Sequence, residues 1–217
     1  MNGKPLISYA IQCALESNYH PDVYVSTDDE EITEISEQYG AMVITRDELL
    51  SSDLVTLDPV VYDATVKAEQ NKGIKYDYVI TIQPTSPLLS TQTLDKAIAY
   101  AIHDNWETVI SVVNHPRLSW TTSGHDIIPL YKERKNRQEL PPQYFETGAF
   151  VISKRCVLKE NSRIGRKISV YEVSDDEGID IDNSSDWILA EGILKKKRIV
   201  FRADGYIELG LGHIYNS

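Results

Sequence analysis

The sequence predicts an α/β fold in which a mostly parallel β-sheet is sandwiched by helices. Segments with helical spacing of apolar residues alternate with short apolar segments that are typical of buried strands. Successive helix and strand units favour right-handed crossovers, which keep the strands parallel and cover both faces of the sheet. The chain has 217 residues, 41% of them hydrophobic, which is enough for one sizeable core.

The first half of the chain is expected to contain three helices that alternate with three strands. The helices begin near Pro5, at the candidate capping residues Asp28 and Asp29, and around Val60. Gly40 is typical of a C-terminal helix stop. The three strands are expected at residues 23–25, 41–45 and 78–82.

The second half continues the alternation on both sides of a polar interruption. A helix is expected over residues 94–102 and a strand over 108–113. The pattern is lost at about 114–145, which is rich in proline and predicts an insertion. Strands at 149–152 and 168–173 and a helix at 184–196 then complete the domain, which we expect to cover residues 1–197.

The composition excludes several classes of function. The net charge of −11 disfavours nucleic acid as a partner, because an acidic surface repels phosphate backbones. Cys13 and Cys156 give neither a disulfide framework nor the spacing of a metal site. No apolar run reaches the ~18 residues of a membrane span, and no leader pattern is recognised, so we do not expect secretion. We therefore expect a cytoplasmic protein with no membrane partner.

Asp180-Ile181-Asp182 gives the sharpest signal for chemistry. Alternate residues of an extended segment point the same way, so two carboxylates would share one face. Such a pair suits Mg²⁺, which takes one or two carboxylates together with phosphate and water oxygens. The alternative is that Asp182 only caps the following helix and that Asp180 is solvated.

Other candidate ligand-binding residues follow predicted strands, where folds of this class bind their ligands. Gln83 opens a rigid segment that ends at Leu88 and can donate and accept hydrogen bonds, although the segment could be a turn and a helix cap. Arg46 could pair with phosphate or carboxylate, or be a surface residue. The basic run from Lys132 to Arg137 could steer an anion or form a solvated face.

The ordered set of segments resembles the acylneuraminate (CMP-sialic acid) cytidylyltransferases. The resemblance extends from Gly3 to Glu191. It rests on the following segments: Gly3 to Ile7, Val25 to Ile32, Arg46 with Asp53, Gln83 to Leu88, Arg137-Gln138 with Leu140-Pro141, Gly148-Ala149, and Asp180 to Asp182 with Asp186 and Ala190-Glu191.

The resemblance implies a nucleotide-diphospho-sugar-transferase-like fold and a reaction of CTP with a nonulosonic acid that gives CMP-sugar and pyrophosphate. It implies that Asp180 and Asp182 hold Mg²⁺ and are catalytic, and that the insertion is a dimerisation subdomain of a homodimer. The remaining roles implied are contacts to the nucleotide from Arg46, Asp53 and Thr56, and contacts to the sugar from Gln83, Thr85 and Arg137.

The two ends of the chain depart from the family pattern. Such enzymes open with an apolar strand and a phosphate-binding loop, whereas this sequence begins directly after that place, at Met1-Asn2-Gly3. We therefore expect this chain to be weakly active or inactive. Residues 198–217, with Gly212-His213, resemble the start of a nucleotide-sugar hydrolase domain of the pseudaminic acid pathway. This favours pseudaminic acid or a similar sugar such as legionaminic acid. Residues 199–201 could alternatively fill the place of the first strand.

Two other functions compete with this interpretation. One is a cytidylyltransferase for the eight-carbon acid 3-deoxy-manno-octulosonate, against which the Gln83 to Leu88 segment and the insertion argue. The other is a truncated domain that dimerises without catalysis. The sequence alone does not identify the general base, for which an aspartate of the pair and a metal-bound hydroxide are the candidates.

Overall fold

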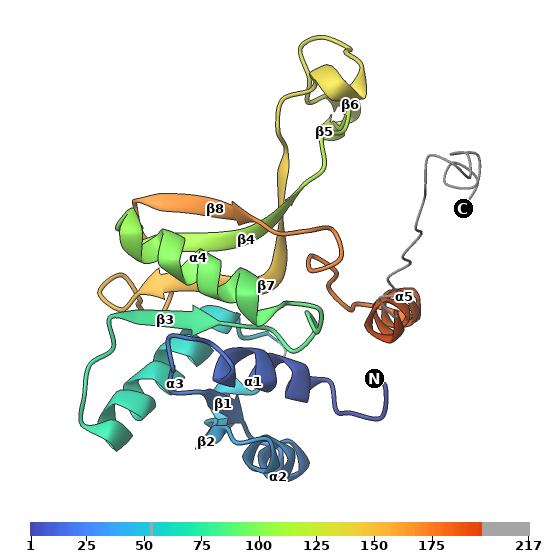
Figure 1. The fold of residues 1–217 in the computed structure, drawn as a ribbon. Coiled ribbons are helices and arrows are strands. Elements are labelled where there is room, and N and C mark those ends of the chain that lie inside the picture. The colour runs from blue at the N-terminus through green and yellow to red at the C-terminus, as the bar shows by residue number, and fades with distance from the viewer. Residues whose placement is uncertain (53, 197–217) are drawn as a thin grey trace, which may run out of the picture.

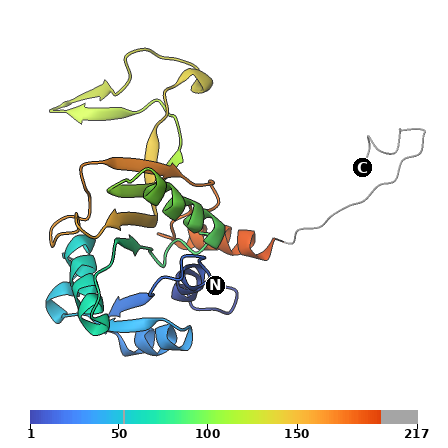
Figure 2. The ribbon, with the colours of Figure 1, turned by 60° about the vertical axis from the view of Figure 1, so that its left-hand side comes forward.

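The computed structural model describes residues 1–52 and 54–196 (Figures 1 and 2). Asp53 and the segment 198–217 therefore lie outside the described residues. The α-helices are α1 (Ile7–Leu15), α2 (Glu30–Gln38), α3 (Leu57–Lys72), α4 (Thr91–His103) and α5 (Ser184–Lys195). The strands are β1 (Tyr24–Thr27), β2 (Met42–Thr45), β3 (Tyr78–Thr81), β4 (Thr108–Asn114), β5 (Trp120–Ser123), β6 (Asp126–Pro129), β7 (Tyr144–Lys154) and β8 (Ile168–Glu172).

The described strands form a four-stranded sheet, a separate parallel pair and the antiparallel β5–β6 pair. The larger sheet has the order β3-β7-β4-β8, and the pair consists of β1 and β2. β4 and β8 are parallel, as predicted, whereas β7 is antiparallel to both of its neighbours. β7 runs the other way because the chain leaves the sheet through β4, passes through the insertion and returns directly beside β4, as in a long hairpin.

The main core lies between the four-stranded sheet and α4, which crosses one face of it (Figure 1). Leu94 and Ala97 of α4 pack with Val109 of β4 and Phe150 of β7, and all four are almost completely buried. The predicted apolar face of the helix over 94–102 is therefore the face that meets the sheet. α3 packs against β1 and β2.

The predicted helix ends are largely confirmed. Asp29 caps α2, because its carboxylate accepts a hydrogen bond of 2.8 Å from the amide of Ile32. Gly40 follows that helix with a φ of +92°, a conformation that favours glycine. Asp28, the other candidate cap, lies one residue outside the capping position.

The pairing of β7 with β4 contains a β-bulge, in which the side chain of Ser111 forms hydrogen bonds to β7. The register between the two strands shifts between Ile110 and Val112. The hydroxyl of Ser111 lies in the shifted region, where it accepts a hydrogen bond of 2.9 Å from the amide of Phe150 and one of 2.9 Å from the hydroxyl of Thr147. The bulge therefore leaves these buried polar groups satisfied.

The insertion between β4 and β7 projects from the sheet as an arm, which we define as residues 115–143 (Figure 1). The arm contains the β5–β6 hairpin, which turns at Gly124 with a φ of +63°. Trp120 packs edge-on against Tyr131, with ring centroids 5.6 Å apart. The sequence predicted the insertion but not the hairpin inside it.

Candidate functional site

Two loops meet at the carboxyl end of β3. The first begins with Gln83, whose carbonyl accepts from the amide of Ser86, and the hydroxyl of Ser86 donates to the carbonyl of Thr147 at 3.3 Å. The second loop carries Asp180 and is held to the first by a hydrogen bond of 2.9 Å from the amide of Ile181 to the carbonyl of Thr85. Thr85 therefore contributes its backbone to this junction.

Glu177 fixes the Asp180 loop to the start of α4. One carboxylate oxygen of Glu177 accepts from the amide and the hydroxyl of Ser90, and the other accepts from the hydroxyl of Thr93 at 3.0 Å. An anionic side chain at a helix N-terminus is also favoured by the helix dipole. Residues 174–180 are thus held by hydrogen bonds and not only by packing.

The junction of the two loops encloses a cavity of about 150 Å³. Its polar lining includes Gln83, Glu146, Arg163 and Asp180, and Ile110 and Val151 contribute apolar side chains. The structure therefore brings Gln83 and Asp180, two of the predicted site residues, into one cavity.

Gly148 makes this arrangement possible. Its φ is +69°, and a Cβ atom added there would lie 2.7 Å from Oε1 of Gln83 and 3.3 Å from Oδ2 of Asp180. A side chain at this position would therefore push against both residues. The resemblance already included Gly148, but the close approach is visible only in the structure.

Asp180 has the features expected of a ligand for a metal ion. Its Oδ1 atom is buried and has no hydrogen-bond partner among the residues described. A buried carboxylate oxygen without a donor is costly, so this atom fits a cation or a donor from a ligand. No cluster of three or more Asp, Glu, His or Cys side chains occurs within residues 1–52 and 54–196.

Asp182 lies close in sequence but in different surroundings. It is exposed and lines a shallow hollow with Trp187 and Asn183. Asn183, not Asp182, caps α5, because its side chain accepts from the amides of Ser185 and Asp186. The alternative interpretation of Asp182 as the helix cap is therefore wrong, whereas its shared metal site with Asp180 stays a prediction.

Arg46 and Thr56 belong to the β1–β2 end of the molecule. The guanidinium of Arg46 donates to the carbonyl and the hydroxyl of Ser26, so it lies along the end of β1. A hydrogen bond from Ser51, a backbone hydrogen bond and the charge of Arg46 lower the pKa of the Asp28 carboxyl. Thr56 is exposed at the N-terminus of α3 and makes no capping hydrogen bond.

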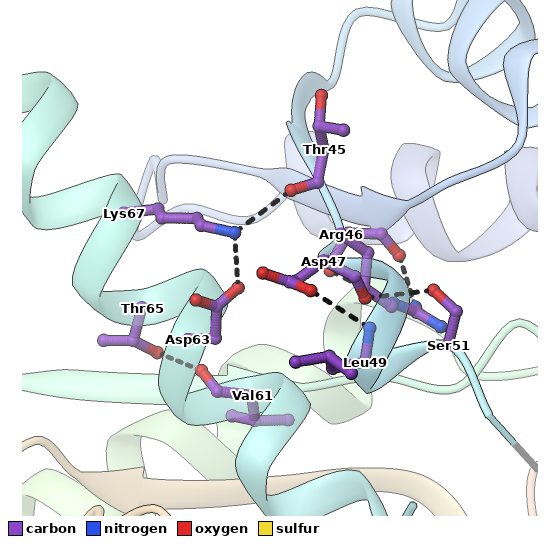
Figure 3. Close-up of polar contacts among 10 residues, drawn as sticks. Thr45, Arg46, Asp47, Leu49, Ser51, Val61, Asp63, Thr65 and Lys67 are labelled. Carbon is purple, nitrogen blue, oxygen red and sulfur yellow. Dashed lines mark hydrogen bonds and ion pairs between the residues drawn. The ribbon is translucent and has the colours of Figure 1, made fainter.

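The segment after β2 is held in place by polar contacts (Figure 3). Asp47 accepts from the amide of Leu49 at 3.0 Å and caps the short 3-10 helix Glu48–Leu50. Lys67 of α3 donates to the carbonyl of Thr45 and pairs with Asp63 at 2.8 Å. The residues next to Arg46 are therefore held by polar contacts, and neither Arg46 nor Thr56 lines the cavity.

Arg137 lies on the arm, at the start of a second 3-10 helix (Arg137–Glu139), and is exposed. It does not line the cavity described above. Arg163 and Glu146 do line it, and sequence reasoning missed both. Neither follows a predicted strand or forms a motif, so the sequence carries no signal for them.

None of the helices within the described part of the chain is both long and apolar enough to cross a membrane.

Known sequences provide an independent comparison. The family model described as "Cytidylyltransferase" matches residues 1–186. N-acylneuraminate cytidylyltransferase A of Danio rerio is 30% identical over 87% of this chain and 44% of its own length. N-acylneuraminate cytidylyltransferase of Streptococcus agalactiae serotype V is 30% identical over 96% of this chain and 53% of its own. The chain thus spans about half the length of these relatives.

Pseudaminic acid cytidylyltransferase of Campylobacter jejuni is also 30% identical, over 89% of this chain and 86% of its own length. Two solved structures share the fold at lower identity. One is a CMP:2-keto-3-deoxy-manno-octonic acid synthetase complexed with CTP, with a TM-score of 0.60, 16% identity, and coverage of 89% and 90% of the two chains. The other is a 4-diphosphocytidyl-2C-methyl-D-erythritol synthase of Anaerococcus prevotii, with a TM-score of 0.64, 14% identity, and coverage of 90% and 88%. The fold, the junction at the end of β3 and these matches agree, and the chain belongs to the cytidylyltransferase family.

Proposed function

We propose that this protein activates a nonulosonic acid, of the pseudaminic or legionaminic type, by reaction with CTP to give CMP-sugar and pyrophosphate. The observation that carries the proposal is the match to a pseudaminic acid cytidylyltransferase along almost the whole of both chains. The cavity at the end of β3 supports it, because it offers an amide, a cation and carboxylates to a polar, charged ligand.

In the proposed reaction, the anomeric hydroxyl of the sugar attacks the α-phosphate of CTP and pyrophosphate leaves in line. The protein has little covalent chemistry to perform, so positioning and charge neutralisation dominate. Gln83 and Thr85 would contact the sugar at the junction of the two loops. Arg46 and Thr56 would lie along the nucleotide at the end of β1 and β2, and Asp53, which the resemblance also assigns to the nucleotide, lies outside the described residues.

We propose Mg²⁺ as the cofactor, held by Asp180 and Asp182. The buried, unpartnered oxygen of Asp180 supports this assignment. When bound, the ion would neutralise charge on the phosphates. The exposed carboxylate of Asp182, which caps no helix, is available for the same purpose.

The direct test is sugar-dependent release of pyrophosphate from CTP by the purified chain. Pseudaminic acid, N-acetylneuraminic acid and 3-deoxy-manno-octulosonate are supplied separately, and the CMP-sugar is identified by mass spectrometry. We expect product with a nine-carbon acid, formed at the low rate that the sequence predicts. Product with the eight-carbon acid alone would favour the alternative enzyme, to which one structural neighbour corresponds by name. Absence of product from every sugar, together with absence of magnesium-dependent CTP binding, would favour the truncated domain that dimerises without catalysis.

We also propose that two copies of the chain associate through the arm, which would bring Arg137 of one copy toward the cavity of the other. The arm exposes apolar side chains: Ile127 is 70% exposed and Leu130 is 64% exposed. Apolar patches of this kind mark interaction surfaces. The assignment of Arg137 to sugar binding depends on this dimer, since Arg137 lies outside the cavity of its own chain.

Replacing Ile127 with aspartate is expected to weaken the dimer by about 30-fold or more, because a charge would be buried at the interface. Light scattering across a concentration series measures the dissociation constant. Ile188→Asp is the matched control, because Ile188 is 71% exposed on α5, away from the arm. If Ile188→Asp dissociates the dimer and Ile127→Asp does not, the dimer interface does not lie on the arm.

Replacing Gly148 with alanine is expected to lower sugar affinity about tenfold or more, because the new Cβ atom would displace Gln83. Sugar affinity is measured by calorimetry. Gly73→Ala is the control: Gly73 also has a positive φ, of +68°, but has open space around it. Both variants carry the cost of the left-handed backbone, of about 1 kcal/mol, so an equal loss of affinity would contradict the role given to Gln83.

We propose the cytoplasm as the location. Both cysteines are free thiols, which fits a reducing compartment. Burial raises the pKa of the Cys13 thiol to about 11, so this thiol stays protonated and unreactive.

A further inference from the structure

Arg163 lines the cavity, and its backbone is held in place by hydrogen bonds. It lies between β7 and β8, in a segment without regular structure. Its carbonyl oxygen accepts from the hydroxyl of Ser153 at 2.7 Å and from that of Thr108 at 3.3 Å. These two bonds hold Arg163 between the end of β7 and the beginning of β4, so its side chain starts from a rigid base.

The guanidinium of Arg163 has hydrogen-bonding capacity that the described residues do not use. The side chain is only 15% exposed, and its one ion pair joins Nε to Oδ1 of Asp58 at 3.5 Å. Nη1 is buried and finds no hydrogen-bond partner among the described residues. A guanidinium carries five donors, and a buried charged donor that stays unpaired is costly.

The same cavity holds two carboxylates that do not pair with Arg163. Glu146 and Asp180 line the cavity with it, yet within the described residues neither comes within the 4.0 Å of an ion pair to Arg163. An anionic ligand would therefore meet Arg163 as the single cation among the cavity's lining residues. Without Arg163, only the two carboxylates would remain charged in the lining, and they would repel an acid.

We propose that Arg163 is a substrate-binding residue that receives the carboxylate of the sugar acid. The inference rests on the proposed function and adds a residue to its substrate site. A guanidinium can bind a carboxylate through two parallel hydrogen bonds. The apolar side chains of Ile110 and Val151 suit the carbon atoms next to a carboxylate better than a chain of phosphates. Gln83, at the same cavity, would meet the neighbouring hydroxyl or amide groups.

The test uses the full 217-residue chain and the variants Arg163→Met and Arg163→Lys. Calorimetry measures the dissociation constants of the sugar acid, of its methyl ester and of CTP. We expect Arg163→Met to raise the constant for the sugar acid by about 10- to 100-fold and to leave that for CTP unchanged. Arg163→Lys should restore part of the affinity, because it keeps the charge but not the planar fork. The methyl ester should bind both forms about equally.

Asp58→Asn is the matched control for a structural role. It removes the ion pair to Arg163 but leaves the guanidinium in the cavity, so sugar affinity should stay within about twofold. An equal loss of affinity in Asp58→Asn and Arg163→Met would show that Arg163 only ties the 155–167 segment to α3.

Two further outcomes would overturn the proposal. A loss of CTP affinity instead of sugar affinity in Arg163→Met would assign the guanidinium to a phosphate. Unchanged sugar affinity in Arg163→Met would remove Arg163 from the site and leave the proposed function intact. If the unmodified chain binds no nonulosonic acid, the proposed function itself fails, and this proposal fails with it.

Discussion

Replacing Asp180 with asparagine is expected to lower the formation of CMP-sugar about a thousandfold. The substitution keeps the size of the side chain but removes the charge at the buried oxygen that has no partner among the described residues. A thousandfold loss of rate corresponds to about 4 kcal/mol of lost electrostatic stabilisation of the transition state. Magnesium-dependent binding of CTP, measured by calorimetry, should weaken in parallel and provides a readout that does not depend on turnover.

Asp176→Asn is the matched control for this experiment, because Asp176 is exposed on the same loop and does not line the cavity. It should retain turnover and magnesium dependence. Full activity in Asp180→Asn, with an unchanged response to magnesium, would contradict the metal site. An equal loss in Asp182→Asn would support a shared ion, whereas normal behaviour of that variant would remove Asp182 from the proposed metal site.

Replacing Glu69 with glutamine is expected to reduce the free energy of unfolding by about 3 kcal/mol at neutral pH. The Glu69 side chain is only 2% exposed and accepts two hydrogen bonds from Arg155, at 2.8 and 3.0 Å. Removing its charge leaves a buried guanidinium without its anion. Urea unfolding of the variant and the parent measures the difference.

The same pair predicts how stability changes with pH. The hydrogen bonds from Arg155 outweigh the effect of burial and, together with Lys75, lower the pKa of Glu69 from 4.5 to about 2. Its stabilising contribution is therefore fully present above about pH 4.5 and is lost as the pH falls towards 2. The difference in unfolding free energy between Glu69→Gln and the parent should shrink over that interval.

Lys75→Met separates the two cations that contact Glu69. The Lys75 side chain is 75% exposed, so its removal should cost less than about 1 kcal/mol. A larger cost for Lys75→Met than for Glu69→Gln would show that the pair with Arg155 does not stabilise the junction between α3 and the end of β7.

Local sequence patterns predicted most of the fold, because most elements follow from spacing and capping. The cap at Asp29 and the stop at Gly40 are local signals, and both are confirmed. The direction of β7 was not predictable in the same way. It depends on where the chain returns after the arm, and no residue in β7 encodes that path.

The candidate site was predictable only in part. Gln83 follows β3, and Asp180 lies a little further downstream of β8. The rule that ligands bind at the carboxyl ends of strands therefore selects both residues. Arg163 follows no such end. It reaches the cavity because Ser153 and Thr108 fix its backbone, and the contact with Thr108 joins residues that are 55 positions apart along the chain.

β7 is a continuous ribbon of eleven residues from Tyr144 to Lys154. Its first residues leave the arm, and Glu146 and Gly148 lie a few positions further on, in the wall of the cavity. The arm and the position where Gln83 and Asp180 approach Gly148 are therefore connected by a single strand. A partner that binds the arm at the start of β7 would therefore sit only a few residues along the chain from the wall of the cavity, without contacting the cavity itself.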